Sequence, residues 1–190
     1  KPLDEALIVA MAERPRRETL SEDGRLVLLA ADHPGRMVVS VGTDPVRMGN
    51  RADYLARIVR VLSASEVDGL MATPDVLEEV VALDRLIRQS GREGFLGRRV
   101  LVGSMNRGGL QNAECELWDM PTAYRSAEEL VEANLDGGKV LWRYTREGRG
   151  NRDSLETMAV VAETISDLVQ EGLATFIEPL AGENRSGKWL

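Results

Sequence analysis

The chain has 190 residues, of which 43% are hydrophobic, and its formal net charge is −7. A chain of this length can bury a sizeable core, and its apolar segments are too short and too interrupted to span a bilayer. Acidic residues are mixed with arginines, and no basic stripe is interleaved with aromatic residues, which argues against nucleic acid as a partner. We therefore expect one globular domain over residues 1–190 that binds neither membranes nor nucleic acid.

The cysteine content predicts a reducing compartment. Cys115 is the only cysteine, and the N-terminal residues lack the basic region, apolar core and small-residue cleavage site of a secretory signal. We therefore expect a cytoplasmic protein.

Strands are predicted where short apolar runs are bounded by turn residues. The run Leu26–Ala31 is nearly unbroken and of strand length, which predicts the first buried strand. Four further runs predict strands at Val67–Ala72, Arg99–Ser104, Lys139–Tyr144 and Ala174–Ile177. The polar residues from Ala181 to Leu190 are expected to form a loop.

Helices are predicted between these strands by apolar stripes and capping residues. A first helix is expected within Leu3–Arg14, and the next begins after the N-cap Asn50. Pro74 fits the first turn of a helix that reaches about Ser90. The capping-box pairs Ser126 with Glu129 and Asp153 with Glu156 predict two more helices, the first ending near Gly137 and Gly138 and the second reaching Gln170 before Gly172.

Buried strands alternating with amphipathic helices predict an α/β fold with a parallel sheet. A doubly wound sheet and a (β/α)8 TIM barrel both fit this alternation. The first predicted strand is followed by Asp-His-Pro-Gly and not by a glycine-rich phosphate turn, which disfavours a dinucleotide-binding sheet. We therefore expect the first five strands of a (β/α)8 barrel whose C-terminal part is missing, since such barrels need about 250 residues.

In such folds the chemistry takes place at the carboxyl ends of the strands. The first strand leads to Asp32 and His33, and the fifth brings Glu178 to the end of an apolar run. A carboxylate in that position needs a partner or a chemical task, because its burial alone is costly. The third strand adds three polar residues as candidates: Ser104, Asn106 and Arg107.

Lysine is rare in this chain. Of 24 basic residues only three are lysines, and two of them, Lys1 and Lys188, lie near the chain ends. The third, Lys139, lies in the fourth predicted strand, where a desolvated amine can act as a base or nucleophile, which arginine cannot do. Lys139 is therefore the lysine placed for chemistry.

Four segments together resemble a little-characterised branch of the class I aldolases. In chain order these are LLAADHPG (28–35), VGSMNRGG (102–109), DGGKVLWR (136–143) and FIEPL (176–180). The branch is similar to tagatose-bisphosphate aldolase and is grouped with the deoxyribose-phosphate and archaeal-type fructose-bisphosphate aldolases. The resemblance implies a lyase that acts on a sugar or sugar phosphate through a lysine Schiff base, without a cofactor and as a homo-oligomer.

The resemblance also implies roles for individual residues. Asp32 would hold a substrate hydroxyl or take its proton, Lys139 would be an auxiliary cation near the imine, and Glu178 would move protons. The Schiff-base lysine would lie on a sixth strand after Leu190, and the phosphate site would lie after strands seven and eight. Apart from the resemblance, their places on or just after the predicted strands make His33, Ser104, Asn106, Arg107 and Arg143 the candidate substrate-binding residues.

Structural readings of the same residues stand beside these. Lys139 could be a structural ion-pair partner, Glu178 could pair with an arginine such as Arg143, and Asn106 could make a turn with the following glycines. His33 could bond the backbone, and the scarcity of histidine argues against a metal site. The alternative functions are a non-catalytic barrel that binds sugar phosphates or metabolites, and a metal-dependent aldolase or isomerase.

Overall fold

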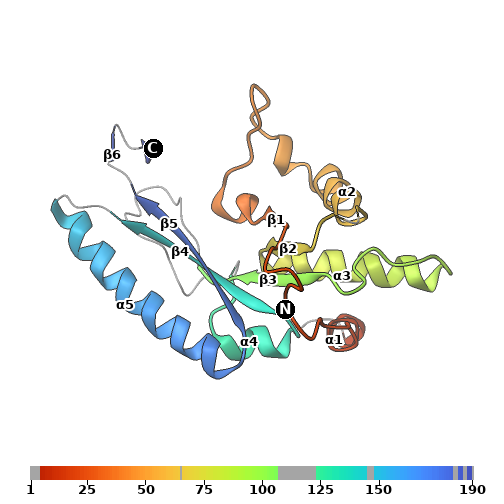
Figure 1. The fold of residues 1–190 in the computed structure, drawn as a ribbon. Helices are drawn as coiled ribbons and strands as arrows, with labels where there is room; N and C mark the ends of the chain where they lie inside the picture. The colour runs from red at the N-terminus through yellow and green to blue at the C-terminus, as the bar shows by residue number, and fades with distance from the viewer. Residues whose placement is uncertain are drawn as a thin grey trace.

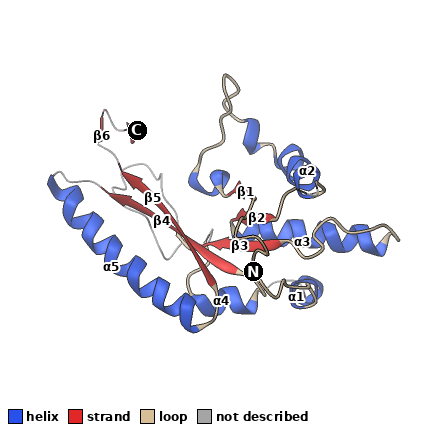
Figure 2. Ribbon diagram, in the orientation of Figure 1, coloured by secondary structure: helices blue, strands red, loops and turns tan. Residues whose placement is uncertain are grey.

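The computed structural model describes residues 5–64, 66–106, 123–144, 148–181, 184–185 and 188–189 (Figure 1). Among these residues no helix is long and apolar enough to cross a membrane. Helices and strands alternate along the chain (Figure 2). The elements are α1 (Glu5–Ala12), β1 (Leu28–Ala31), the 3-10 helices η1 (His33–Arg36) and η2 (Arg47–Gly49), α2 (Arg51–Leu62), β2 (Gly69–Ala72), α3 (Pro74–Gln89), β3 (Val100–Ser104), α4 (Ala127–Glu132), β4 (Gly137–Tyr144), α5 (Gly148–Gln170), β5 (Ala174–Ala181), β6 (Asn184–Arg185) and β7 (Lys188–Trp189).

Five strands form one parallel sheet in the order β1-β2-β3-β4-β5. Each strand therefore pairs with its predecessor in sequence, and every crossover proceeds in the same direction. A doubly wound sheet reverses its direction at a switch point, and the described sheet does not. The predicted α/β fold is confirmed as a half-barrel of five parallel strands with helices.

A contact across the sheet shows how strongly it curls. The Nζ atom of Lys139, on β4, lies 2.8 Å from Oδ2 of Asp32, the residue that follows β1. Three strand-to-strand steps separate β1 from β4, which is about 14 Å in a flat sheet. Two side chains cannot bridge that distance and meet at hydrogen-bond range, so the sheet must bend around their common face as it does in a barrel.

The two faces of the sheet have different environments. Alternate residues such as Leu70, Leu101 and Val140 belong to the main apolar cluster, together with residues of the surrounding helices such as Ile58 and Val80. The helices α2, α3, α4 and α5 contact β1, β3, β4 and β5. The opposite, concave face carries the polar side chains that make up the candidate site.

Most predicted element boundaries are confirmed to within a few residues. The Asn50 side chain caps α2 by accepting a hydrogen bond from the Asp53 amide, and Pro74 begins α3. Ser126 caps α4 as predicted, but the Glu129 carboxylate accepts its hydrogen bond from the amide of Arg125, one residue before the cap. Gly172 has a φ of +68° and follows α5, as expected for a helix C-terminus.

The predicted role of the Gly137–Gly138 pair was wrong. Helix α4 ends at Glu132, followed by Asn134 with a φ of 51°, and the two glycines begin β4. A β-carbon on Gly138 would lie 2.5 Å from Sδ of Met105, and one on Gly137 would lie 2.5 Å from the carbonyl oxygen of Ala174. Glycine is therefore needed here for close packing and not to end a helix.

The last third of the chain also differs from expectation. Helix α5 begins at Gly148, so Asp153 lies inside the helix and is not its N-cap, and Glu156 pairs with Arg152 on the helix surface. Strand β5 continues to Ala181, past the predicted end at Ile177. Beyond it, β6 and β7 pair as a short antiparallel ladder where a loop was expected.

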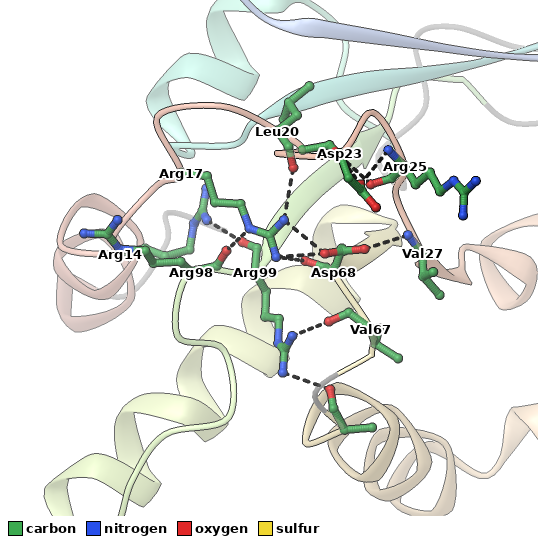
Figure 3. Close-up of polar contacts among 12 residues, drawn as sticks. Arg14, Arg17, Leu20, Asp23, Arg25, Val27, Val67, Asp68, Arg98 and Arg99 are labelled. Carbon is green, nitrogen blue, oxygen red and sulfur yellow. Dashed lines mark hydrogen bonds and ion pairs between the residues drawn. The ribbon is translucent and has the colours of Figure 1, made fainter.

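An arginine-rich segment after α1 holds the amino ends of the strands, and Figure 3 shows part of it. Two nitrogens of Arg17 donate to Oδ1 of Asp68, which lies just before β2, at 3.0 and 3.1 Å. Oδ2 of Asp68 accepts from the Val27 amide at 2.8 Å, and the Nε of Arg17 donates to the carbonyl of Arg98. The starts of β1, β2 and β3 are thereby linked through one carboxylate and one guanidinium.

Asp136 plays the matching role before β4. Its Oδ2 accepts from Arg14 at 2.9 Å and from the Leu101 amide at 2.8 Å, while its Oδ1 accepts from Arg16 at 2.9 Å. Arg14 and Asp136 are both buried. We call Arg14, Arg16, Arg17, Asp68 and Asp136 the amino-end clasp. It ties the segment after α1 to the sheet.

Candidate functional site

The candidate site lies level with the carboxyl ends of β1 and β3, where Ser104, the last residue of β3, pairs with Lys139 inside β4. Nζ of Lys139 is 2.8 Å from Oδ2 of Asp32 and 2.6 Å from Oε2 of Glu178. The register of the sheet explains this proximity, because Lys139 lies opposite Phe176 and Glu178 lies two residues further along β5, on the same face. One ammonium group therefore lies between two carboxylates.

The two carboxylates differ in their access to solvent. The Lys139 side chain is only 2% exposed and the Asp32 side chain 5%, whereas the Glu178 side chain is 42% exposed. Glu178 therefore stands at the open side of the site and Asp32 at its closed side. A proton that enters this group from solvent therefore reaches the exposed Glu178 before the buried Lys139 and Asp32.

The residues after β1 form η1, which places a cationic side chain near Asp32. Pro34 lies in the first turn of η1, and a β-carbon on Gly35 would lie 2.6 Å from Cγ2 of Thr73 at the end of β2. This close approach needs glycine and fixes η1 over the end of the sheet. Arg36 then places a guanidinium nitrogen 3.6 Å from Oδ1 of Asp32.

The charges around Asp32 keep it ionised. Burial by itself raises the pKa of this carboxyl, but the nearby Lys139 ammonium, with smaller contributions from Arg36 and His33, more than offsets that effect. The pKa of Asp32 therefore lies below its ordinary value. At neutral pH Asp32 is an acceptor for Lys139 and not a proton donor.

The structure places Ser104 at this group and Asn106 against the backbone of β4. The hydroxyl of Ser104 donates to Oδ2 of Asp32 at 3.5 Å, a long hydrogen bond. Asn106 donates from Nδ2 to the Leu141 carbonyl at 2.6 Å and accepts from the Leu141 amide at 2.8 Å. Asn106 thus extends the pairing of β3 with β4, and the glycines with which a turn was expected lie outside the described residues.

The remaining predicted residues are less central. His33 lies in η1, half-exposed, with Nδ1 3.8 Å from Oδ1 of Asp32. Arg143 is buried on the same face of β4 as Lys139, and the ion pair of Glu178 is with Lys139 and not with Arg143. Arg107 lies outside the described residues. The structure therefore brings together Asp32, Lys139, Glu178, Ser104 and, more loosely, His33.

Sequence reasoning missed two residues near the site. Arg36 lies one helical turn after Asp32, and this spacing could have been recognised as a pair. Tyr54, in the first turns of α2, has a buried hydroxyl that makes no hydrogen bond to the described residues. Burial, with the Asp32 carboxylate adding to it, raises the pKa of Tyr54 to about 12. Tyr54 lies on the buried face of α2 with Ile58 and Leu62, and this apolar spacing alone does not indicate a buried hydroxyl.

The arrangement is suited to proton transfer. Among the residues whose placement is described, no group of three or more histidine, cysteine, aspartate or glutamate side chains could hold a metal ion. The group contains an ammonium that donates to two carboxylates, and the more exposed of these, Glu178, can relay protons to and from solvent. Such a relay can serve a carbonyl reaction that needs protons moved to and from an oxygen.

Comparisons with known proteins agree with this architecture. A family model described as Cgl0159-like matches residues 24–190. The crystal structure of Cgl0159 from Corynebacterium glutamicum is 31% identical with a TM-score of 0.80 and is aligned over 97% of this chain. The chain spans 58% of the length of that protein. A structure of a Schiff-base-forming fructose-1,6-bisphosphate aldolase is 17% identical to this chain, with a TM-score of 0.49. The alignment covers 97% of this chain and 60% of the aldolase chain. No curated protein matches the chain.

Proposed function

Because the chain belongs to the Cgl0159-like family and holds a buried lysine between two carboxylates, we propose that the protein is a class I aldolase-type lyase. Its substrate would be a sugar or sugar phosphate. The observation that carries the proposal is the position of Lys139, with Nζ within 2.8 Å of Asp32 and 2.6 Å of Glu178 at the carboxyl end of a curled parallel sheet. The resemblance of four segments to class I aldolases supports the same reaction.

We assign the residues the following roles. Glu178, which faces solvent, relays protons to and from the carbinolamine. Lys139 is the cation beside the imine, where like-charge repulsion favours a neutral amine on its neighbour. Asp32, kept ionised by its neighbours, accepts a hydrogen bond or a proton from a substrate hydroxyl.

We assign the rest of the site to further strands of the full-length protein. Because the chain spans 58% of Cgl0159, we propose that residues 1–190 are the first five strands of a barrel that further strands complete in the full-length protein. The imine-forming lysine is assigned to the sixth strand and the phosphate site to the loops after strands seven and eight. His33, Ser104, Asn106, Arg107 and Arg143 remain the proposed substrate contacts.

Borohydride trapping tests the reaction class. The full-length protein is incubated with several sugars and sugar phosphates that carry a carbonyl group, reduced with borohydride and analysed by mass spectrometry. We expect a stable adduct on a lysine, since reduction of an imine fixes the substrate to the amine.

The other outcomes identify the competing functions. Absence of an adduct, together with turnover that a chelator abolishes, would contradict the proposal and favour a metal-dependent aldolase or isomerase. Absence of both adduct and turnover, with measurable binding of a sugar phosphate, would favour a non-catalytic binding barrel.

A further inference from the structure

A polar depression lies at the amino end of the sheet, away from Lys139. It is a cleft of about 350 Å³ between the segment after α1 and the turn that joins α3 to β3. Because α3 ends at Gln89 and β3 begins at Val100, this turn leads into the start of a strand. The residues that line the cleft are Pro15, Arg88, Arg92, Glu93, Gly94, Gly97 and Arg98.

Buried contacts hold the wall of this cleft in place. Asp84 of α3 is 6% exposed, and its Oδ2 accepts from Nε of Arg88 at 2.6 Å. Its Oδ1 accepts from the Leu96 amide at 2.8 Å. A β-carbon on Gly94 would lie 2.5 Å from this Oδ1, so glycine lets the turn lie directly against the pair. Asp84 therefore holds the Arg88 guanidinium and the turn at Leu96 in place without a ligand.

The cleft carries more positive than negative charge. Three arginines and one glutamate line it; Asp84 offsets the charge of Arg88, and Arg92 and Arg98 outweigh Glu93, although the whole chain has a net charge of −7. The guanidinium groups of Arg92 and Arg98 make no ion pair or hydrogen bond with any side chain or backbone group in the described part of the chain. Their donors remain available for a ligand.

We propose that this cleft binds a small phosphate-bearing anion. Guanidinium groups present paired donors that match phosphate oxygens, and such charge-assisted hydrogen bonds are stronger than neutral ones. A volume of about 350 Å³ is at the lower end of the range of small-molecule sites, which suits a compact anion with one or two phosphate groups. The cleft is independent of the proposed aldolase site, so either assignment can fail without the other.

Calorimetric titration of the full-length protein with pyrophosphate, at constant ionic strength, tests the proposal. We expect binding at the cleft to weaken about tenfold or more in Arg92→Gln/Arg98→Gln, since two charge-assisted contacts are lost. The matched control is Arg25→Gln/Arg60→Gln, which removes the same charge from exposed arginines that do not line the cleft. This control is expected to bind pyrophosphate as the wild type does.

Three outcomes would overturn the proposal. These are the absence of pyrophosphate binding by the wild type, equal weakening in both double variants, and binding unaffected by Arg92→Gln/Arg98→Gln. Equal weakening would mean attraction to net charge alone, and unaffected binding would place the anion at another site. The single variants Arg92→Gln and Arg98→Gln, each expected to weaken binding by about threefold, give the same test if the double variant does not fold.

Discussion

The two ends of the sheet hold buried ion pairs of different chemistry. At the amino end, Arg14 donates to Asp136 at 2.9 Å, and both groups also bond the backbone. At the carboxyl end, Nζ of Lys139 lies 2.8 Å from Asp32 and 2.6 Å from Glu178, and among the described residues its ion pairs are with these two carboxylates. Arginine keeps its proton and suits a permanent tie, whereas lysine can release one. Under the proposed function, the ion pair at the amino end stabilises the fold and the one at the carboxyl end takes part in the chemistry.

The largest expected effect is on turnover when Lys139 is replaced. Lys139→Met in the full-length protein leaves Asp32 and Glu178 without their shared cation, and we expect turnover to fall by about 10²- to 10⁴-fold. Lys139→Arg restores the charge, but the planar guanidinium cannot take the place of the compact ammonium between the two carboxylates, so we expect it to remain about tenfold or more below wild type. Steady-state kinetics of both variants measure this. Wild-type turnover in Lys139→Met would remove the lysine from the mechanism.

At the amino end the expected effect is on stability. Asp136→Ala leaves the buried Arg14 guanidinium without its carboxylate, and we expect a loss of about 3–5 kcal/mol in the free energy of unfolding. Turnover per folded molecule is expected to stay unchanged. Urea denaturation provides the measurement. The control is Glu156→Ala, which breaks an exposed pair with Arg152 and is expected to cost at most about 1 kcal/mol. Equal losses in both variants would contradict the clasp.

The sheet order was predictable and the clasp was not. Buried strands appear as short apolar runs, the strand-end rule selected Asp32 and Glu178, and the rarity of lysine together with the family resemblance added Lys139. The clasp joins Arg14 to Asp136 across more than a hundred residues, and no local pattern encodes that pairing. Only the folded sheet brings these two residues together.

Predictions from local sequence patterns were wrong where the same pattern occurs in two structural settings. A glycine pair is typical of a helix end, but Gly137 and Gly138 are glycine because neighbouring atoms leave no room for a β-carbon. The Asp153–Glu156 spacing is typical of a capping box, yet the same spacing recurs inside helices such as α5. The buried hydroxyl of Tyr54 was hidden by the apolar stripe to which its ring belongs.

Acid unfolding separates the contribution of Asp32. Its pKa in the folded protein lies below the ordinary value of 3.8, so its stabilising effect is complete above that value and is lost as the pH falls through the lower, folded pKa. We expect the unfolding free energy of Asp32→Asn to depend less steeply on pH below about pH 4 than that of the wild type. Urea melts across this range measure the slopes. Parallel slopes would mean that Asp32 gains nothing from Lys139.

The smallest expected effect concerns Tyr54. Its hydroxyl is buried without a hydrogen bond to the described residues, so Tyr54→Phe removes an unsatisfied polar group. We expect the free energy of unfolding to stay within about 0.5 kcal/mol of wild type or to rise. Thermal unfolding followed by circular dichroism is sufficient. A loss above about 1 kcal/mol would reveal a partner for the hydroxyl.

The most direct test of the central claim is the turnover of Glu178→Gln in the full-length protein. The amide keeps the shape of the side chain but cannot relay protons, so we predict that turnover falls by about 10²- to 10⁴-fold while the protein stays folded. Wild-type turnover in this variant would contradict the account and leave the ion pair of Glu178 with Lys139 as a structural contact.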